Sequence, residues 1–296
     1  PARVGVFVVG LAAVFAAALG VGNAVGLVAD EPVSHDDEHV AGGSDGSGAH
    51  GGGHEGTSTA TDLPGGLMVS QDGYTLELAG DTARPGRAVP LAFTVTGPDG
   101  HPVTEYDVEH EKRLHLIAVR RDFSGFQHVH PDLDAEGVWT TSLDLDPGQW
   151  RVFADFRPTG ADALTLGADL SVAGDYSPLP PAEETRTAEV DGYTVTLDGD
   201  LVAGADAKLT LTVTKGGRPV TTEPYLGASG HLVALREGDL AYLHVHPEEG
   251  DALVFYAAVP SAGGYRLFLD FQHDGVVRTA EFALRTSTEG EGHGDH

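Results

Sequence analysis

Residues 115–131 read HLIAVRRDFSGFQHVHP, and residues 231–247 read HLVALREGDLAYLHVHP with no gap between the two strings. The segments that flank these strings also recur, in the same order and at a spacing near 116 residues. Self-similarity at a fixed spacing is the mark of a repeated structural unit. The sequence therefore predicts two copies of one domain, copy one over 67–174 and copy two over 189–286.

Both copies consist of short apolar segments bounded by Gly, Pro and Asp, which is the pattern of β-strands. In copy one these segments lie at 73–79, 89–96, 114–120, 126–130, 138–145, 150–156 and 165–172. Beyond the first 28 residues, no helical periodicity persists for more than two turns. We predict an all-β protein of two tandem β-sandwiches, immunoglobulin-like or cupredoxin-like in form, with a Pro-rich linker at 175–188.

The N-terminal segment predicts a membrane anchor at 1–28. Residues 4–28 are 25 consecutive positions without a charge, and about 20 are enough to cross the bilayer core. Arg3 precedes this run and an acidic stretch at 30–38 follows it. That asymmetry places the bulk of the chain outside the cytoplasm, in a single-pass topology. A cleaved signal peptide, which would leave the protein secreted, is the alternative.

Two His-rich, acidic segments flank the predicted domains. One is a linker at 29–66, which is predicted to be disordered because it has little apolar content, and the other is the tail at 287–296. They are interpreted either as solvated tethers or as loose metal-collecting arms. The second interpretation rests on the fact that imidazole and carboxylate bind divalent transition ions even in a flexible chain.

The composition excludes several classes of function. The chain has 45 acidic and 17 basic residues and a formal charge of −28, which opposes binding to nucleic acid. It has no cysteine and one methionine, which excludes disulfides, zinc fingers, iron–sulfur clusters, blue-copper sites and thioether sites for Cu(I). Any metal must therefore be held by His, Asp, Glu or backbone, and 15 histidines are present.

The repeated string of copy one carries three candidate metal ligands. His128 and His130 project from the same face of a strand, because alternate residues of a strand share a face. The intervening turn at 121–125 would fold the preceding strand back, so that His115 lies opposite position 131, beside His130. Three imidazoles at the end of one hairpin are a plausible metal site.

Copy two carries the equivalent residues, His231, His244 and His246. The same hairpin geometry would place His231 beside His246, although a shift of one residue in register would turn a side chain to the other face. Each copy is therefore predicted to offer a three-imidazole site, with copy one the stronger candidate. The alternative is that these histidines are hydrogen-bonded structural residues.

Other residues could complete the sites. Asp155 and Asp270 occupy matched places on a later strand and could act as a fourth ligand or orient a ligand histidine. They could instead form salt bridges to Arg120 and Arg236, which are also matched between the copies. His110 lies just before the strand of His115 and is a further candidate ligand in copy one. Copy two has no equivalent histidine.

A site of imidazole and carboxylate suits Cu(II), Zn(II) and Ni(II). Cu(II) binds most tightly in the Irving–Williams order, whereas Cu(I) prefers sulfur ligands that this chain lacks. The sequence therefore predicts Cu(II) as the bound ion, with Zn(II) second.

The string from Leu114 to Pro131, followed by Phe-Ala-Asp-Phe at 153–156, resembles a group of bacterial secreted or membrane-anchored proteins. They are described as heavy-metal-associated or YtkA-like β-sandwich proteins. The resemblance covers copy one well and copy two in part, because a different turn stands at 238–241. It implies a sandwich fold and an extracytoplasmic metal-handling role, and it assigns no ligand.

The expected function is that of an extracytoplasmic, membrane-anchored protein that sequesters or delivers Cu(II) or Zn(II) through its histidine clusters. The alternative is a metal-free tandem β-sandwich protein of the surface, adhesion or interaction type. An enzyme of the two-domain cupin type is disfavoured, because Gly125 is too close to His128 and copy one has no histidine after His130. The expected partners are metal ions and the membrane, and no protein partner is identified.

Overall fold

The computed structural model of this chain describes residues 63–243, 245–248, 250 and 252–287. The predicted anchor at 1–28, the His-rich linker up to residue 62, His244 and the tail from residue 288 lie outside the described residues. What the sequence predicts for them stays a prediction. Within the described ranges, no helix is long and apolar enough to cross a bilayer.

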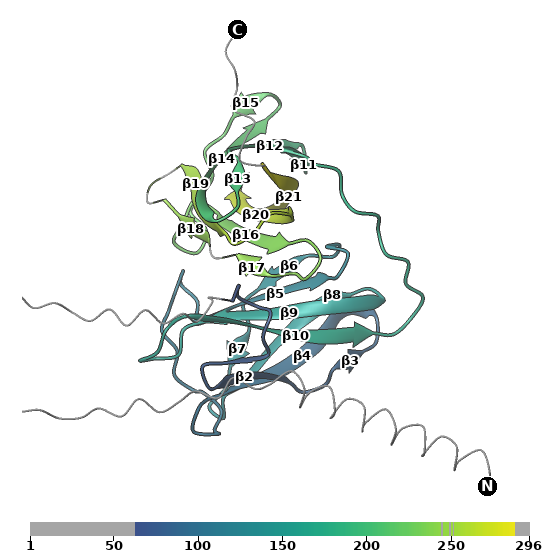
Figure 1. The fold of residues 1–296 in the computed structure, drawn as a ribbon, viewed down its shortest axis with the longest axis vertical. Helices are drawn as coiled ribbons and strands as arrows, with labels where there is room; N and C mark the ends of the chain where they lie inside the picture. Colours follow the sequence, from purple (N-terminus) through teal and green to yellow (C-terminus); the bar gives the residue numbers. More distant parts are fainter. Residues whose placement is uncertain (1–62, 244, 249, 251, 288–296) are drawn as a thin grey trace, which may run out of the picture. The chain divides into compact units, whose positions relative to one another are not determined.

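Copy one is a β-sandwich of two five-stranded sheets (Figure 1). One sheet has the strand order β1-β2-β4-β8-β7, and the other has the order β3-β10-β9-β5-β6. The strands are β1 (Ser70–Gln71), β2 (Tyr74–Leu78), β3 (Thr82–Ala83), β4 (Gly86–Thr96), β5 (Leu114–Arg120), β6 (Gln127–Val129), β7 (Asp132–Leu133), β8 (Val138–Leu145), β9 (Gly148–Phe156) and β10 (Leu164–Val172).

Copy two repeats this topology, with the orders β11-β12-β14-β19-β18 and β13-β21-β20-β16-β17. The tandem all-β prediction is thereby confirmed. The strands are β11 (Thr187–Val190), β12 (Tyr193–Asp198), β13 (Leu201–Val202), β14 (Ala205–Lys215), β15 (Arg218–Pro219), β16 (His231–Arg236), β17 (Tyr242–Leu243), β18 (Val245–Pro247), β19 (Leu253–Val259), β20 (Gly264–His273) and β21 (Val276–Ser287). Strand β15, which pairs with β14, has no counterpart among the described strands of copy one.

Alternate residues of the strands form the core of each sandwich. In β4, Leu91, Phe93 and Val95 are buried between the two sheets, while the residues between them are half-buried. The equivalent residues of β14 are Leu209, Leu211 and Val213. This alternation is what the periodicity of a strand with one buried face predicts.

A third apolar layer joins the two copies, and we call it the seam. It consists of Ile117, Val119, Phe123 and Phe153 from copy one, with Val233, Leu235, Leu240 and Phe268 from copy two. Phe126 stacks on Phe268 with ring centroids 4.0 Å apart and planes at 4°. Strand β5 is therefore buried on both faces, because Leu116 points into the core of copy one while Ile117 points into the seam.

The folded chain begins before the predicted boundary at residue 67. The backbone amide of Tyr242 donates to the carbonyl of Gly65 at 2.9 Å, and the amide of Gly66 donates to the carbonyl of Thr165 at 2.7 Å. The guanidinium of Arg151 also donates to the carbonyl of Gly66, at 2.6 Å. The end of the segment assigned to the disordered linker is thus part of the folded unit.

Gly167 on β10 leaves no room for a side chain. A Cβ at this position would lie 2.1 Å from the carbonyl oxygen of Gly66 and 2.7 Å from a guanidinium nitrogen of Arg151. We expect Gly167→Ala to displace residues 65–66 and to lower the free energy of unfolding by about 1–3 kcal/mol, measured by urea denaturation. Gly80→Ala, whose Cβ would meet nothing closer than 3.9 Å, is the matched control. Equal losses in the two variants would contradict the expectation.

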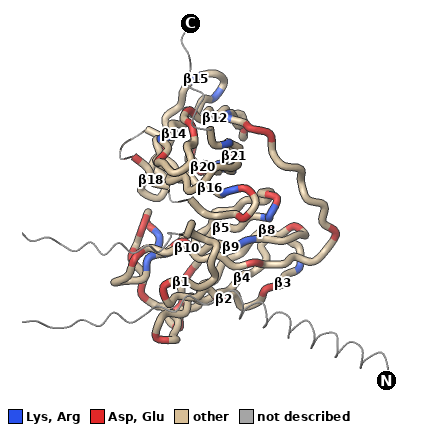
Figure 2. Tube along the Cα trace, viewed as in Figure 1, with Lys and Arg blue, Asp and Glu red and all other residues tan. Residues whose placement is uncertain are grey.

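The acidic excess is dispersed. Figure 2 shows Asp and Glu at many separate places along the described chain, in both copies. This distribution is that of a solvated exterior.

Candidate metal centre

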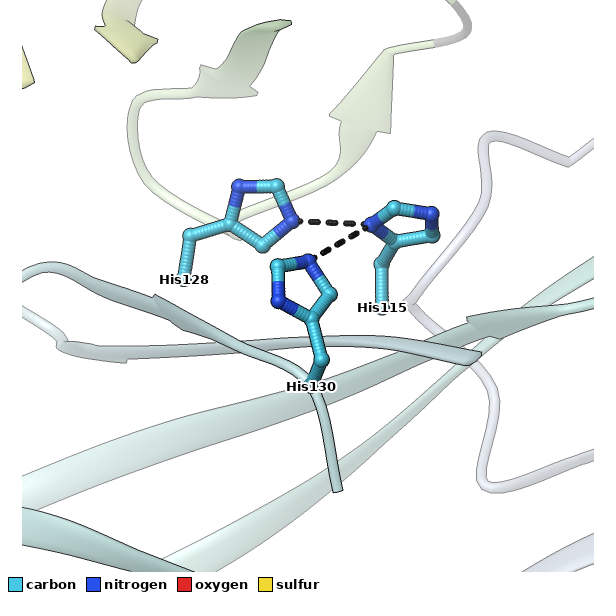
Figure 3. A group of neighbouring side chains, drawn as sticks. All are labelled: His115, His128 and His130. Carbon is cyan, nitrogen blue, oxygen red and sulfur yellow. Dashed lines mark hydrogen bonds between the residues drawn. The ribbon is translucent and has the colours of Figure 1, made fainter. Parts of the chain in front are cut away.

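Three histidines of copy one converge on one point (Figure 3). His115 lies on β5, His128 lies on β6, and His130 follows β6. Nδ1 of His115 is 3.1 Å from Nε2 of His128 and 3.2 Å from Nε2 of His130. One potential ligand atom from each ring lies within 4.8 Å of the other two. The structure thus brings together the three imidazoles that the sequence places in one hairpin.

The hairpin register explains this convergence. Ile117 of β5 pairs with His128 of β6, and Leu116 pairs with Val129. His115 therefore faces position 130 rather than the predicted position 131. The three side chains lie on the seam side of the sheet, because odd-numbered residues of β5 point away from the core of copy one.

Neighbouring groups select the protonated nitrogen of two rings. Nε2 of His115 lies 3.1 Å from the carbonyl oxygen of Glu109, which can only accept, so Nε2 donates and Nδ1 carries the lone pair. Nδ1 of His128 lies 2.8 Å from Oδ2 of Asp270, so Nδ1 donates and Nε2 carries the lone pair. The two lone pairs face each other across 3.1 Å. A cation between the rings could accept both lone pairs.

The spacing of the rings fits coordination of one ion. Two nitrogens at about 2.0–2.1 Å from a shared ion are about 2.9 Å apart at a right angle and about 3.3 Å apart at the tetrahedral angle. The separations of 3.1 Å and 3.2 Å fall in this range. The three ring centroids are 5.0–5.3 Å apart, close to the value of about 5.2 Å for imidazoles arranged tetrahedrally around an ion.

Burial favours the neutral form of His115, His130 and His231. Desolvation, together with the nearby His128, lowers the pKa of His115 to about 3 and the pKa of His130 to about 4. Desolvation likewise lowers the pKa of His231 to about 4. Neutral imidazole is the form that binds metals, so ring lone pairs are available at neutral pH.

His231 of copy two joins the histidines of copy one. Its ring centroid lies 5.1 Å from that of His110, 6.1 Å from that of His115 and 6.2 Å from that of His128. Its Nε2 donates to the carbonyl oxygen of Tyr225 at 2.9 Å, which leaves the lone pair on Nδ1. The two copies therefore contribute to one histidine cluster.

A small cavity of about 70 Å³ lies within this cluster. It is lined by His110, His115, His128, Asp155 and His231, together with apolar residues of copy two. A cavity of this size is large enough for an ion with a bound water.

The predicted hairpin site of copy two is not formed by the described residues. Strand β17 pairs with β16 only through Tyr242 and Leu243, and the chain then crosses to the other sheet. There His246 pairs with Tyr256 of β19 and is exposed. The hairpin is too short to return His246 to His231, so the prediction that these two residues lie side by side on one hairpin is wrong. His244 lies outside the described residues.

Asp155 and Asp270 lie at matched positions beside the cluster. Asp155 is directly opposite His115 in the β5–β9 pair, and Asp270 is directly opposite His231 in the β16–β20 pair. Each carboxylate also accepts a hydroxyl hydrogen bond on its own sheet, Asp155 from Thr165 and Asp270 from Thr279. Burial raises the pKa of Asp155 to about 6.

The alternative of Arg–Asp salt bridges is excluded for these two carboxylates. Arg120 donates to Ser124 and to the carbonyl of Pro147, and Arg236 pairs with Asp239. The carboxylate of Asp270 instead accepts a hydrogen bond from Nδ1 of His128 and so orients that ring.

Sequence reasoning missed the carbonyls of Glu109 and Tyr225 and the pairing of His128 with Asp270. Every residue has a backbone carbonyl, so residue type does not indicate which carbonyl accepts a hydrogen bond. The paired side chains of His128 and Asp270 are 142 residues apart in the chain. One signal was present: the repeated strings HLIAV and HLVAL are apolar at both alternating positions, which is the pattern of a strand buried on both faces.

Two segments of the chain, 69–173 and 188–288, match one family, described as a domain of unknown function (DUF8832). This confirms the duplicated domain, whereas membership in the heavy-metal-associated group stays a prediction. No curated protein matches the chain.

The chain is also similar to several solved structures. They include the Escherichia coli adhesin FdeC, with 16% identity over 74% of this chain and 65% of that chain and a TM-score of 0.26. A chimeric titin Z1Z2 tandem is 14% identical over 72% of this chain and 100% of that chain, with a TM-score of 0.20. A two-domain fibronectin type III segment of chicken tenascin is 10% identical over 76% of this chain and 100% of that chain, with a TM-score of 0.23.

These similarities carry no functional argument, because the TM-scores are low and this chain spans only 65% of the adhesin chain. The family match is of a different kind, since its two segments together cover more than half of the residues. On that ground the chain belongs to the DUF8832 family, with two tandem copies of its domain.

Proposed function

We propose that this protein is an extracytoplasmic, membrane-anchored metal-binding protein that sequesters or delivers Cu(II), with Zn(II) as the second candidate. The observation that carries the proposal is the convergence of His115, His128 and His130 on one point. Two of the three rings are oriented by acceptors on their far nitrogens, the carbonyl of Glu109 and the carboxylate of Asp270. Metal-ligating histidines in proteins are held in this way.

The donor set favours a borderline divalent ion. Imidazole nitrogens suit Cu(II) and Zn(II), and Cu(II) binds more tightly at a given nitrogen site. Three protein ligands leave a coordination position for water, a carboxylate or an incoming ligand. Such a site can release its ion as well as store it, because no thiolate is present to retain it.

The competing function is that of a metal-free surface or interaction protein. In that case the two sandwich cores and the seam would hold the described fold together, and the histidine cluster would be a structural hydrogen-bond network. The printed description of FdeC is that of an adhesin, but its TM-score of 0.26 lends this alternative no weight. The response of the fold to metal separates the two functions.

The proposal is tested by metal binding to the full chain in a tail-substituted background. In this background the tail histidines are replaced by Asn: His35, His39, His50, His54, His293 and His296. Cu(II) is expected to raise the midpoint of thermal unfolding through linkage, with a stabilisation of about 2.7 kcal/mol at a free concentration of 100 Kd. His128→Ala/His130→Ala is expected to lower the affinity by about 100-fold or more, because loss of a ligand costs more than loss of its hydrogen-bond partner.

The matched control is His101→Ala, which removes an exposed histidine in a turn of copy one. Its Cu(II) affinity should equal that of the tail-substituted chain. If neither Cu(II) nor Zn(II) shifts the unfolding midpoint, or if the double variant binds as tightly as the control, the metal-free alternative is correct.

A further inference from the structure

The geometry points to one metal centre that spans both copies, rather than one centre in each copy. In this arrangement, which rests on the proposed function, copy two completes the site of copy one. Asp270 is the positioning residue for His128, and His231 is a further imidazole of the same centre. Copy one thus supplies three imidazoles of a single site, and copy two supplies His231 and the carboxylate of Asp270.

The hydrogen bond between His128 and Asp270 crosses from one copy to the other. It is 2.8 Å long, and each of the two side chains is only 5% exposed. A carboxylate is costly to bury unless its oxygens are satisfied, and the second oxygen of Asp270 accepts the hydroxyl of Thr279. The hydroxyl of Thr279, on β21, therefore fixes one oxygen of the carboxylate, while the other oxygen accepts the hydrogen bond from the ring of His128. This contact fixes both the tautomer and the direction of the Nε2 lone pair.

His231 is placed to join the three rings of copy one. The carbonyl of Tyr225 occupies its Nε2, so the lone pair of Nδ1 is available to an ion. The ring lines the same cavity as His115 and His128. Its centroid lies 6.1 Å and 6.2 Å from those two rings, roughly 1 Å more than the spacing expected around one ion. The proposed centre requires the ring of His231 to approach these two rings by roughly 1 Å.

The reason for a shared site lies in the strand faces. His115 is on the face of β5 that carries Ile117 and Val119, and His231 is on the face of β16 that carries Val233 and Leu235. These faces pack on each other in the seam, so residues at the ends of the two rows meet. His246, by contrast, lies on the other sheet of copy two. An ion bound here therefore links the copies as well as the three rings.

The experiment measures Cu(II) binding to the full chain with the tail histidines replaced by Asn. We expect one high-affinity ion per chain. Asp270→Ala should lower the affinity about 10- to 100-fold and change the Cu(II) electron paramagnetic resonance spectrum, because the ring of His128 is no longer oriented. Asp270→Asn keeps an acceptor oxygen and should restore part of the loss. His231→Ala should lower the affinity and also change the spectrum.

Two controls separate this effect from a loosened seam or a second site. Val119→Ala removes seam packing four residues from His115, so it should lower stability while the Cu(II) spectrum stays unchanged. His246→Ala should leave both the stoichiometry and the affinity unchanged. Two high-affinity ions per chain, with one lost in His246→Ala, would overturn the shared centre in favour of one site per copy.

The failure of this inference differs from the failure of the proposed function. If His128→Ala/His130→Ala abolishes binding while Asp270→Ala and His231→Ala keep the spectrum and affinity of Val119→Ala, copy one binds metal alone and the shared centre is wrong. If His128→Ala/His130→Ala binds as the parent does, the proposed function fails first and the shared centre fails with it.

Discussion

Replacing Phe268 by Ala is expected to lower the free energy of unfolding by about 3–5 kcal/mol. Phe268 lies on the outer face of the β20 sheet of copy two, yet it has no exposed surface. It is covered by copy one, where its ring stacks on Phe126 at 4.0 Å. The substitution would leave a cavity between the copies and remove this stack, and guanidinium denaturation monitored by Trp fluorescence would measure the loss.

The size of this effect decides whether the copies pack on each other in solution. Val276→Ala is the control, because Val276 is 48% exposed at the far end of the neighbouring strand, and its cost should stay within about 0.5 kcal/mol. If Phe268→Ala costs no more than this control, Phe268 is solvated and the seam does not form. The shared metal centre would then lose its structural basis.

Lowering the pH from 6.5 to 4 is expected to destabilise the metal-free chain by about 1–3 kcal/mol per pH unit. The folded state depresses the pKa of His115 from 6.5 to about 3 and the pKa values of His130 and His231 to about 4, in each case chiefly through desolvation. In this window these three histidines bind protons in the unfolded chain, whereas they stay neutral in the folded chain. Stability therefore rises with pH up to about 6.5 and falls as the solution is acidified.

Asp155 opposes part of this trend. Burial raises its pKa from 3.8 to about 6, so between these values the folded state binds the proton and gains stability as the pH falls. One carboxylate offsets about one of the three histidines, and the net sign remains that of the histidines. Asp155→Asn should therefore steepen the loss of stability on acidification.

The measurement is guanidinium denaturation at pH 4, 5, 6 and 7 with a chelator present. His130→Gln should flatten the profile, because one of the histidines with a lowered pKa is gone; the exposed His101, replaced by Ala, serves as the control. A stability that does not change between pH 5 and 7 would contradict the burial of these rings.

The sequence predicted the features that depend on short stretches of chain. The duplication follows from the match between residues 115–131 and 231–247, and the strands follow from short apolar segments between turn residues. The grouping of His115, His128 and His130 required only the two-residue period of a strand and one tight turn. The register in the structure differs by one residue from the predicted one, and it places His115 opposite position 130, on the same face as His128.

The prediction for copy two was wrong because it assumed that a matched string makes a matched hairpin. The pairing of β17 ends at Leu243, and the chain then continues on the other sheet. The point at which the chain passes from one sheet to the other depends on how the whole sandwich packs. The local sequence therefore does not determine where the hairpin ends. The same limit hid the partner of His128, since Asp270 is brought near it only by packing of the two copies.

By itself, the sequence determined which chemical groups are available to bind a metal and that the protein contains two copies of one domain. With no cysteine and one methionine, only imidazole and carboxylate are available to a transition metal, and the repeat shows where they gather. Only the tertiary structure decided that the two copies share one cluster. The physical reason is the seam: the outer faces of β5 and β16 are both apolar and bury each other, and this burial carries His231 and Asp270 to the histidines of copy one.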